Sequence, residues 1–275
     1  MARRHTRTRR RPRRRRPRNK VFYAPSANTC PSAGLDAGAE CAQRATGREE
    51  AIGVDQRDAP DAFAQARRVM VDRQIRARGV RDERVLRAMQ RVPRERFVPV
   101  DARAEAYLDR PLPIGSGQTI SQPYMVATML DVLACESEMT ALEIGAGSGY
   151  QAALLGELCR EVWAVEIVEG LATRAQAVLE DLGYDNVHIV VADGTEGLPE
   201  HAPYDRIIVA AGAPTVPAPL QQQLADGGRL VIPVGSRINQ CLVVIDREGE
   251  EFVQRESTPC VFVPLVGRHG WKDHL

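Results

Sequence analysis

The sequence has no long apolar run, no closely spaced pair of cysteines and few aromatic side chains. No stretch approaches the roughly 20 consecutive apolar residues that a membrane-spanning helix needs. The Arg-rich start is followed by VFYAPSANTCPSAG, which lacks the apolar region of a secretion signal. We therefore expect no membrane segment and no export, and we predict a cytoplasmic protein.

Cysteine and histidine are too scattered to suggest a metal site or a disulfide framework. The six cysteines form no CxxC motif, and a chain of 275 residues can fold without disulfides. We predict reduced, mostly buried thiols and no structural zinc or other metal. The residues concerned are Cys30, Cys41, Cys135, Cys159, Cys241, Cys260, His5, His188, His201, His269 and His274.

Charge is distributed unevenly along the chain. Residues 1–20 carry eleven arginines and Lys20 with no acid, which leaves 25 basic and 36 acidic side chains in the remainder. Residues 1–60 show no apolar period, and we predict that they form a disordered Arg-rich tail and linker. The tail is either a solvated extension or a tether for nucleic acid or another anionic surface, and Met70 offers an alternative, shorter start.

Hydrophobic periodicity organises residues 61–275 into one domain. Apolar residues at helical spacing predict a helix from Ala62 and a second helix that Pro93 ends, which together form an N-terminal helical cap. Short β-branched runs then alternate with amphipathic segments, which predicts an α/β fold with a mostly parallel sheet and antiparallel strands at the C-terminal end. The predicted strands cover 141–144, 162–167, 187–191 and 206–210, the predicted helices about 149–159 and 169–182, and the C-terminal strands VIPVG, CLVVID, EFVQRE and VFVPLV.

A glycine-rich turn joins the first predicted strand to the helix after it. The strand ends near Glu143, and Gly145, Gly147 and Gly149 follow. Glycines let the backbone turn sharply and approach a ligand whose polar groups meet the helix N-terminus. In the dinucleotide fingerprint the third glycine would stand where Tyr150 does, so the spacing favours the nucleoside of a methyl donor over a pyrophosphate.

Two further acids end the next two predicted strands. Glu166 lies 17 residues past the last glycine, where its carboxylate could accept both ribose hydroxyls. Asp193 could accept the adenine amino group, and Gly194 would let the ring lie close. Each acid alone is more often a helix cap or a loop residue. Because ligands of open α/β sheets bind beyond the carboxyl ends of the strands, the three acid-bearing strand ends together predict one site.

Several segments, taken in order, resemble one enzyme family. GQTISQPYMVA precedes ALEIGAGSGYQAA, then VADG, LVIPVG and VFVPLV follow, and RVPRERFVP lies upstream at 91–99. Together they closely resemble the protein-L-isoaspartate O-methyltransferases over about residues 69–271. The basic front is not part of that family's pattern, and the final VGRHGWKDHL matches it only loosely.

The resemblance implies a Rossmann-like methyltransferase with helices on both faces of its sheet. Such an enzyme would transfer a methyl group from S-adenosylmethionine to the free carboxylate of L-isoaspartyl residues in damaged proteins or peptides, which initiates repair. Ser121 matches the family's active-site serine. The matches to its cofactor contacts are Gln122, Pro123, Tyr124, Gly145, Glu166, Asp193 and Gly194, to which the glycine turn adds Glu143, Gly147 and Gly149, and the expected substrate contacts are Thr119, Ser121, Val234 and Gly235.

The chemistry of a carboxylate acceptor fits the absence of a catalytic triad. A carboxylate with a pKa of about 4 is already ionised at neutral pH and needs no general base. The enzyme has to align the reacting atoms in a site shielded from water. Ser121 lies just ahead of Pro123, which is well suited to a first helical position, and its hydroxyl could donate a hydrogen bond that orients a carboxylate. We expect the enzyme to be a monomer.

Other function classes are disfavoured. An amino methyltransferase of nucleic acids commonly has an Asn/Asp-Pro-Pro-aromatic loop after the fourth strand, where this chain reads AAGAP at 210–214. Tyr150 disfavours a nicotinamide-dependent oxidoreductase. A non-enzymatic nucleic-acid-binding module would need aromatic side chains among basic ones in its folded part, and the aromatic content is only 5%.

Overall fold

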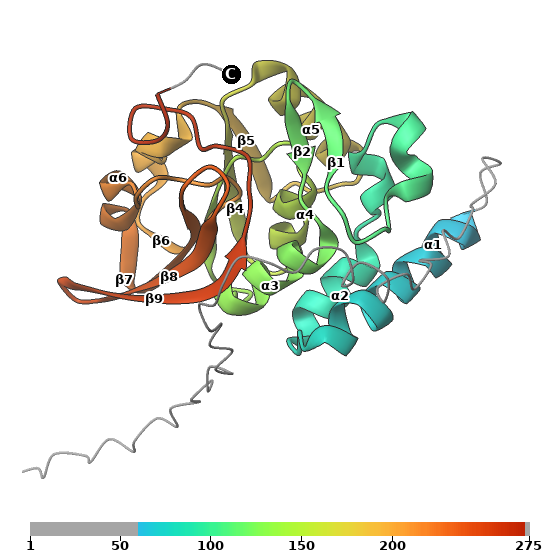
Figure 1. Cartoon of the computed structure of the whole chain (residues 1–275), viewed down its shortest axis with the longest axis horizontal. Coiled ribbons are helices and arrows are strands. Elements are labelled where there is room, and N and C mark those ends of the chain that lie inside the picture. The colour runs from blue at the N-terminus through green and yellow to red at the C-terminus, as the bar shows by residue number, and fades with distance from the viewer. Residues whose placement is uncertain (1–59, 273–275) are drawn as a thin grey trace, which may run out of the picture. The chain divides into compact units, whose positions relative to one another are not determined.

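A seven-stranded sheet forms the centre of the part of the chain that the structure, a computed structural model, describes, residues 60–272 (Figure 1). The strand order is β5-β4-β3-β6-β7-β8-β9; the strands from β5 to β7 are parallel, and β8 and β9 are added antiparallel to that edge. The strands are β3 (Thr140–Ile144), β4 (Glu161–Glu166), β5 (Val187–Val191), β6 (Tyr204–Val209), β7 (Leu224–Gly235), β8 (Gln240–Glu248) and β9 (Glu251–Cys260).

This sheet confirms the predicted α/β architecture. The observed bounds of β3 to β6 agree with the predicted ones to within two residues. The central strand β3 is buried along its whole length, as a parallel strand covered on both faces should be. The edge strand β9 is exposed along most of its length and carries charged side chains, which discourage pairing with another chain.

One C-terminal prediction was wrong. The segment VFVPLV at 261–266 does not form a strand, and its residues make only isolated bridges, Gly212 with Pro264 and Val266 with Trp271. Pro264 has no N–H to donate to a ladder. The segment leaves the sheet edge after Cys260 and crosses toward Gly212, and its side chains Phe262 and Leu265 are buried in the two hydrophobic cores.

Helices cover both faces of the sheet, as predicted. Helices α3, α4 and α5 and the cap share one hydrophobic core with the sheet, and the second core on the opposite face involves α6, the η6 turn and Leu265. The bounds are α3 (Pro123–Leu133), α4 (Tyr150–Gly156), α5 (Glu169–Asp181), η5 (Gly194–Glu196), η6 (Pro199–His201) and α6 (Ala218–Gln222). Over residues 60–272, no helix is both long and apolar enough to span a membrane.

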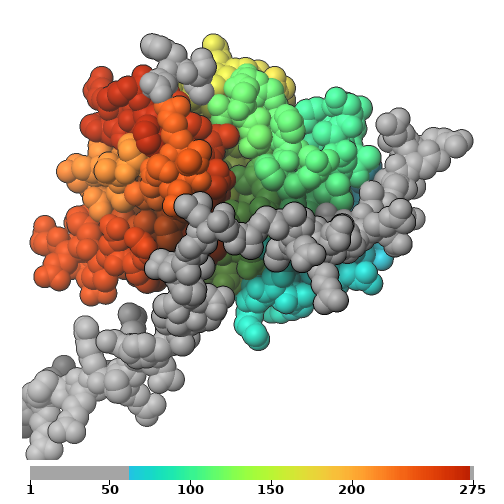
Figure 2. Space-filling model, in the orientation of Figure 1, coloured from blue at the N-terminus to red at the C-terminus, as the bar shows by residue number. Residues whose placement is uncertain are grey.

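The predicted helical cap precedes the sheet. It consists of α1 (Pro60–Val69), η1 (Met70–Ile75), η2 (Arg76–Arg78), α2 (Glu83–Arg91), η3 (Arg94–Phe97) and η4 (Val100–Glu105), followed by the hairpin β1 (Leu112–Gly115) and β2 (Gln118–Ile120). In Figure 2 the cap, in cyan, and the C-terminal strands, in orange to red, lie on opposite sides of the visible face. Arg67 in α1 donates to the Arg91 carbonyl at 2.6 Å and to the Tyr107 hydroxyl at 3.1 Å. A start at Met70 would remove these contacts. The predictions for the Arg-rich tail fall on residues outside the described part.

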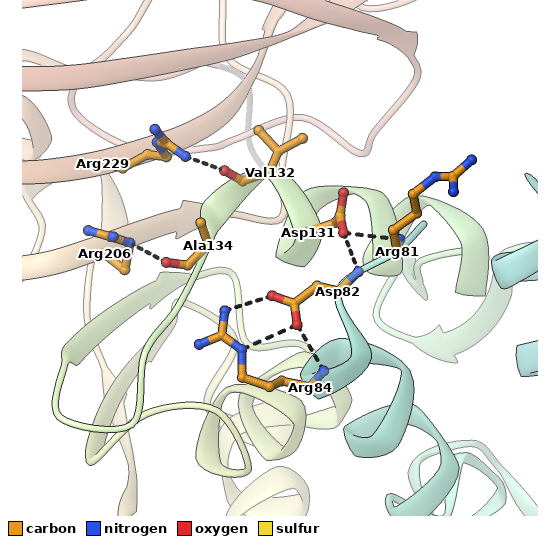
Figure 3. A network of polar contacts seen from close by, with 8 residues as sticks. All are labelled: Arg81, Asp82, Arg84, Asp131, Val132, Ala134, Arg206 and Arg229. Carbon is orange, nitrogen blue, oxygen red and sulfur yellow. Dashed lines mark hydrogen bonds and ion pairs between the residues drawn. The ribbon is translucent and has the colours of Figure 1, made fainter. Parts of the chain in front are cut away.

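Helix α3 connects the cap to the sheet. Asp131 in α3 accepts hydrogen bonds from the backbone N–H groups of Arg81 and Asp82 just before α2 (Figure 3). At the end of α3, the Arg229 guanidinium donates to the Val132 carbonyl at 2.8 Å, and that of Arg206 donates to the Ala134 carbonyl at 3.1 Å. These arginines satisfy carbonyls that a helix C-terminus leaves unpaired.

Candidate active site

A cleft opens at the carboxyl ends of β3, β4 and β6, where the sequence predicts a ligand site. It holds about 800 Å³ of empty space, its open mouth included. Its walls come from segments far apart in the chain. The lining residues are 118–121, 143–148, 165–167 and 263–266, with Val126, Tyr150, Gln151, Gly194, Ala210 and Ala211.

The glycine turn is built as predicted and forms one wall of the cleft. Gly145 and Gly149 adopt φ of +84° and +85°, a left-handed conformation that favours glycine. A Cβ on Gly149 would lie 3.1 Å from the Cβ of Ala175 in α5, so this glycine also permits close packing of two helices. The N–H of Gly145 donates to the Val165 carbonyl at 2.8 Å, which joins the turn to the end of β4.

Glu166 holds the turn and faces the cleft. One carboxylate oxygen accepts from the N–H of Gly147 at 2.7 Å, and the other accepts from the N–H of Val168 at 2.9 Å. Each carboxylate oxygen can accept more than one hydrogen bond. The carboxylate is therefore fixed by the backbone and can still accept two hydroxyl groups of a ligand. Its neighbour Ile167 also lines the cleft, with 41% of its surface exposed, and offers an apolar face to a flat ring.

Glu143 is the least satisfied polar group of the cleft. It is completely buried, and neither of its carboxylate oxygens has a hydrogen-bond partner in the structure. Burial raises its pKa well above the ordinary value; the nearby Gln151 amide opposes that shift and the Glu166 carboxylate adds to it. A buried carboxyl without a partner is costly. Its position in the cleft wall suits a ligand that brings a cationic donor.

Ser121 and Thr119 line the cleft just ahead of α3. Both residues also line a second hollow next to the cleft. The carbonyl of Ser121 accepts a hydrogen bond from the buried Arg94 guanidinium at 2.8 Å. Gln122 is the N-cap of α3 and Pro123 its first residue, so Ser121 lies next to the positive end of the helix dipole.

Gln122, Pro123 and Tyr124, three of the predicted cofactor contacts, do not lie among the residues that line the cleft. Asp109 engages two of them, because one carboxylate oxygen accepts from the Gln122 side chain and the other from the N–H of Tyr124, both at 2.9 Å. Pro123 is buried in the core. These residues shape the start of α3, and Gln122 also reaches the second hollow.

Asp193 lies beside the cleft and fastens the C-terminal segment to it. One carboxylate oxygen accepts from the N–H and hydroxyl of Thr195, and the other accepts from the N–H of Arg268 at 2.7 Å. Burial alone would raise the pKa of Asp193, but these hydrogen bonds hold it below the ordinary value. Gly194 does line the cleft, and a Cβ there would lie 2.5 Å from the Cγ2 atom of Ile144.

The C-terminal segment is the part of the site that sequence reasoning missed. Residues 263–266 line the cleft, and the chain beyond them is anchored at several points. The N–H of Gly212 donates to the Val263 carbonyl at 2.8 Å, and the Trp271 indole N–H donates to the Gly212 carbonyl at 2.9 Å. The two glycines of VGRHGW were a signal in the sequence, because glycine often marks a close approach between two parts of the chain. In the structure a Cβ on Gly267 would overlap the Asp193 side chain.

Val234 and Gly235, predicted to contact the substrate, lie at the end of β7 and do not appear among the residues lining the cleft or the second hollow. The N–H of Gly235 donates to the Ala213 carbonyl at 3.0 Å, and Val234 packs against the second hydrophobic core. They support the loop after β6. Within residues 60–272, no cluster of three metal-ligating side chains occurs.

Comparison with known proteins agrees with this geometry. The family model of protein-L-isoaspartate(D-aspartate) O-methyltransferase matches residues 65–270. The protein-L-isoaspartate O-methyltransferase of Roseiflexus sp. (strain RS-1) is 52% identical over 209 residues, which cover 76% of this chain and 95% of the relative. The protein-L-isoaspartate O-methyltransferase 2 of Pelobacter propionicus is 54% identical over 207 residues, with coverage of 74% and 92%.

Two solved structures are also similar. A protein-L-isoaspartate O-methyltransferase superposes with a TM-score of 0.67 at 29% identity, over 74% of this chain and 67% of that one. A putative protein-L-isoaspartate O-methyltransferase from Plasmodium falciparum, in complex with S-adenosyl-L-homocysteine, superposes with a TM-score of 0.62 at 25% identity, over 72% of this chain and 96% of that one.

Replacing Glu143 by Gln should stabilise the ligand-free protein. The folded state holds the proton of Glu143 at pH values where the unfolded chain has lost it, so stability falls as the pH rises from the unfolded pKa through the folded one. Removing the buried acid should contribute about 1–3 kcal/mol at neutral pH. Each kcal/mol raises Tm by about 2–4 °C in a domain of this size.

Thermal unfolding from pH 5 to pH 8 measures this effect. The gain in Tm of E143Q over wild type should grow as the pH rises. Glu250→Gln, at an exposed position in the turn between β8 and β9, serves as the control and should show no such growth. A Tm of E143Q below that of wild type across this range would contradict the prediction.

Replacing Asp193 by Asn should release the C-terminal segment. The pKa of Asp193 is lowered by folding, so its stabilisation is complete above the unfolded value of about 3.9 and is lost as the pH falls through the folded value. At pH 7, loss of the charged acceptor should weaken the anchoring by about 1.5–3 kcal/mol. Trypsin should then cut after Arg268 at least about tenfold faster.

Asp205→Asn is a matched control for this experiment, because the Asp205 carboxylate likewise accepts a backbone N–H, that of Thr140, at 2.9 Å. That variant should leave cleavage after Arg268 unchanged. Equal cleavage rates in D193N and wild type, read by mass spectrometry, would show that Asp193 does not hold the segment.

Proposed function

The chain belongs to the protein-L-isoaspartate(D-aspartate) O-methyltransferase family, and from that membership and the geometry of the cleft we propose its activity. It transfers a methyl group from S-adenosylmethionine to the free carboxylate of L-isoaspartyl residues in damaged proteins and peptides, which initiates their repair. The observation that carries the assignment is that Ser121, just ahead of α3, lines the same cleft as Glu143 and Glu166.

The cleft has the groups that S-adenosylmethionine requires. Glu166 can accept the two ribose hydroxyls, because each of its oxygens makes one backbone hydrogen bond and keeps a lone pair. Ile167 offers its exposed side chain to the adenine ring. Glu143 can accept the ammonium group of the methionine part, which would give its unpaired oxygens a partner. These three contacts account for the polar and apolar ends of the cofactor.

The acceptor carboxylate needs alignment rather than activation. When bound, S-adenosylmethionine supplies a methyl group on a positively charged sulfur, and transfer to a carboxylate oxygen leaves S-adenosylhomocysteine and a methyl ester with no proton to move. Ser121 can donate its hydroxyl proton as a hydrogen bond to the acceptor carboxylate, near the positive end of α3. Positioning of this kind can lower a barrier by about 7–11 kcal/mol.

The acceptor peptide lies in the second hollow, which adjoins the cleft. The two share Thr119, Ser121 and Val263. Within residues 60–272, no charged side chain lines the hollow, and one of its walls is the extended segment that includes Val261, which is 68% exposed. The Gln240 side chain holds this segment by accepting from the N–H of Phe262 at 2.9 Å and donating to its carbonyl at 3.3 Å. A rigid, uncharged wall suits the peptide backbone on either side of the damaged residue.

The enzyme acts in the cytoplasm as a monomer. All four cysteines within residues 60–272 are free thiols, as is usual in a reducing compartment.

The activity is tested with purified protein, radiolabelled S-adenosylmethionine and a pair of peptides that differ only in L-isoaspartate or L-aspartate. Base-labile methyl esters should form on the isoaspartyl peptide, with kcat/KM at least about 10² higher than for the aspartyl peptide. The same wild-type protein should bind S-adenosylhomocysteine in a calorimeter. If the protein binds S-adenosylhomocysteine but labels neither peptide, the isoaspartyl carboxylate is not the acceptor, and nucleic acid would be the next substrate to try.

A charge at Val261 should impair binding of the peptide without affecting the cofactor. V261D puts a carboxylate on the uncharged wall of the hollow, and we expect KM for an isoaspartyl hexapeptide to rise about tenfold, which corresponds to about 1.4 kcal/mol. Val253→Asp is the matched control, because Val253 is also exposed, at 44%, but lies near the start of β9 and does not line the hollow. An unchanged KM in V261D would show that the peptide does not bind in the second hollow.

A further inference from the structure

Arg94 is an unusual residue for the interior of this protein. It begins η3 and is the largest fully buried side chain among residues 60–272. Burial lowers the pKa of its guanidinium, which nonetheless keeps its charge, as arginine does in proteins. No carboxylate lies within ion-pair distance of it in the described part of the chain. A buried cation without an ion-pair partner is costly, and a purely structural contact could be made by a neutral side chain.

The guanidinium joins three segments of the chain. Its Nε atom donates to the Ala106 carbonyl of the cap at 2.7 Å, and one terminal nitrogen donates to the Ser121 carbonyl at 2.8 Å. Its central carbon lies 4.8 Å from the centre of the Tyr150 ring, a cation–π contact. The other terminal nitrogen, Nη1, is buried and has no partner.

Two of these three segments line the cleft. Ser121 belongs to the acceptor side, and Tyr150 is the first residue after the glycine turn on the cofactor side; both line the cleft. A planar guanidinium with donors in fixed directions sets both the distance and the orientation of the groups it contacts. The Arg94 side chain therefore fixes the position of the Ser121 backbone relative to Tyr150.

We propose that Arg94 is a positioning residue for methyl transfer, which acts by fixing the Ser121 main chain so that the serine hydroxyl meets the acceptor carboxylate. The inference rests on the proposed function. It gives the cap a part in positioning the reacting groups, because the guanidinium belongs to η3 and donates to the Ala106 carbonyl in the cap.

The chain provides a matched control at the other end of α3. The Arg206 guanidinium donates to the Ala134 carbonyl at 3.1 Å, and burial lowers its pKa as well (Figure 3). Arg94 and Arg206 thus make the same kind of bond to the chain flanking one helix. Only Arg94 makes it at the active-site end.

The test is a double-mutant cycle with R94K, S121A and the double variant, with R206K as control. Lysine keeps the charge but cannot donate to both carbonyls in the geometry of a guanidinium. We expect R94K to lower kcat for the isoaspartyl peptide at least about tenfold and to leave the Kd for S-adenosylhomocysteine within about threefold. R206K should keep kcat within about twofold. The double variant should be no slower than S121A, because Arg94 has nothing left to orient once the hydroxyl is gone.

Several outcomes would overturn the inference. A kcat of R94K within twofold of wild type would do so, as would a double variant whose loss is the product of the single losses, since both would reduce Arg94 to a structural contact. If circular dichroism shows that R94K does not fold, R94Q takes its place with the same expectations. If wild type itself fails to methylate the isoaspartyl peptide, the proposed function fails and this inference with it; a normal wild type beside an unimpaired R94K overturns the inference alone.

Discussion

Two hydrogen bonds to one carboxylate, from the N–H groups of Gly147 and Val168 to Glu166, hold the cleft in shape. They fasten the glycine turn after β3 to the loop after β4, and a turn with several left-handed glycines would otherwise have much conformational freedom. Helix α4 starts directly after this turn with Tyr150, so the same bonds place the ring against which Arg94 rests. The position of Ser121 therefore depends on the Glu166 carboxylate, because Glu166 fixes the turn before Tyr150, and Arg94 contacts both Tyr150 and Ser121.

The features that sequence could predict are those set by neighbours along the chain. Period-two and continuous apolar runs gave the strands of the parallel sheet, and three acid-bearing or glycine-bearing strand ends had to meet because parallel strands end at one edge. Glu143, Gly145 and Glu166 accordingly line the cleft together, and so does Gly194. Ser121 and Thr119 also line it, although only resemblance to a family pointed to them, because a serine ahead of a proline is otherwise an ordinary helix start.

The features that sequence could not predict depend on contacts between distant residues. Asp193 ends its strand as expected, yet it binds the N–H of Arg268, 75 residues further on, so it serves the C-terminal segment beside the cleft. Gln122 and Tyr124 are engaged by Asp109, whose role no local pattern marked. The VFVPLV segment has the composition of a strand, but Pro264 and the bonds to Gly212 make it a wall of the cleft. Propensity is overruled here by tertiary hydrogen bonds.

Most of the buried side-chain polar atoms that have no partner within residues 60–272 belong to the cleft or lie directly behind it, and the others are Gln74 Oε1 and Arg103 Nε in the cap. Away from the cleft, carboxylates such as Asp131 and Asp246 have backbone or arginine donors. In the cleft, Glu143 has none, and Gln151 and Tyr150 each have a buried polar atom without a partner, as does Arg94 behind them. A sequence selected only for stability would remove such groups, because apolar replacements of similar volume cost less. Their retention around one cleft is the physical argument that the site binds a ligand with charges of its own. A ligand that brings a cationic donor would give the Glu143 carboxylate a partner.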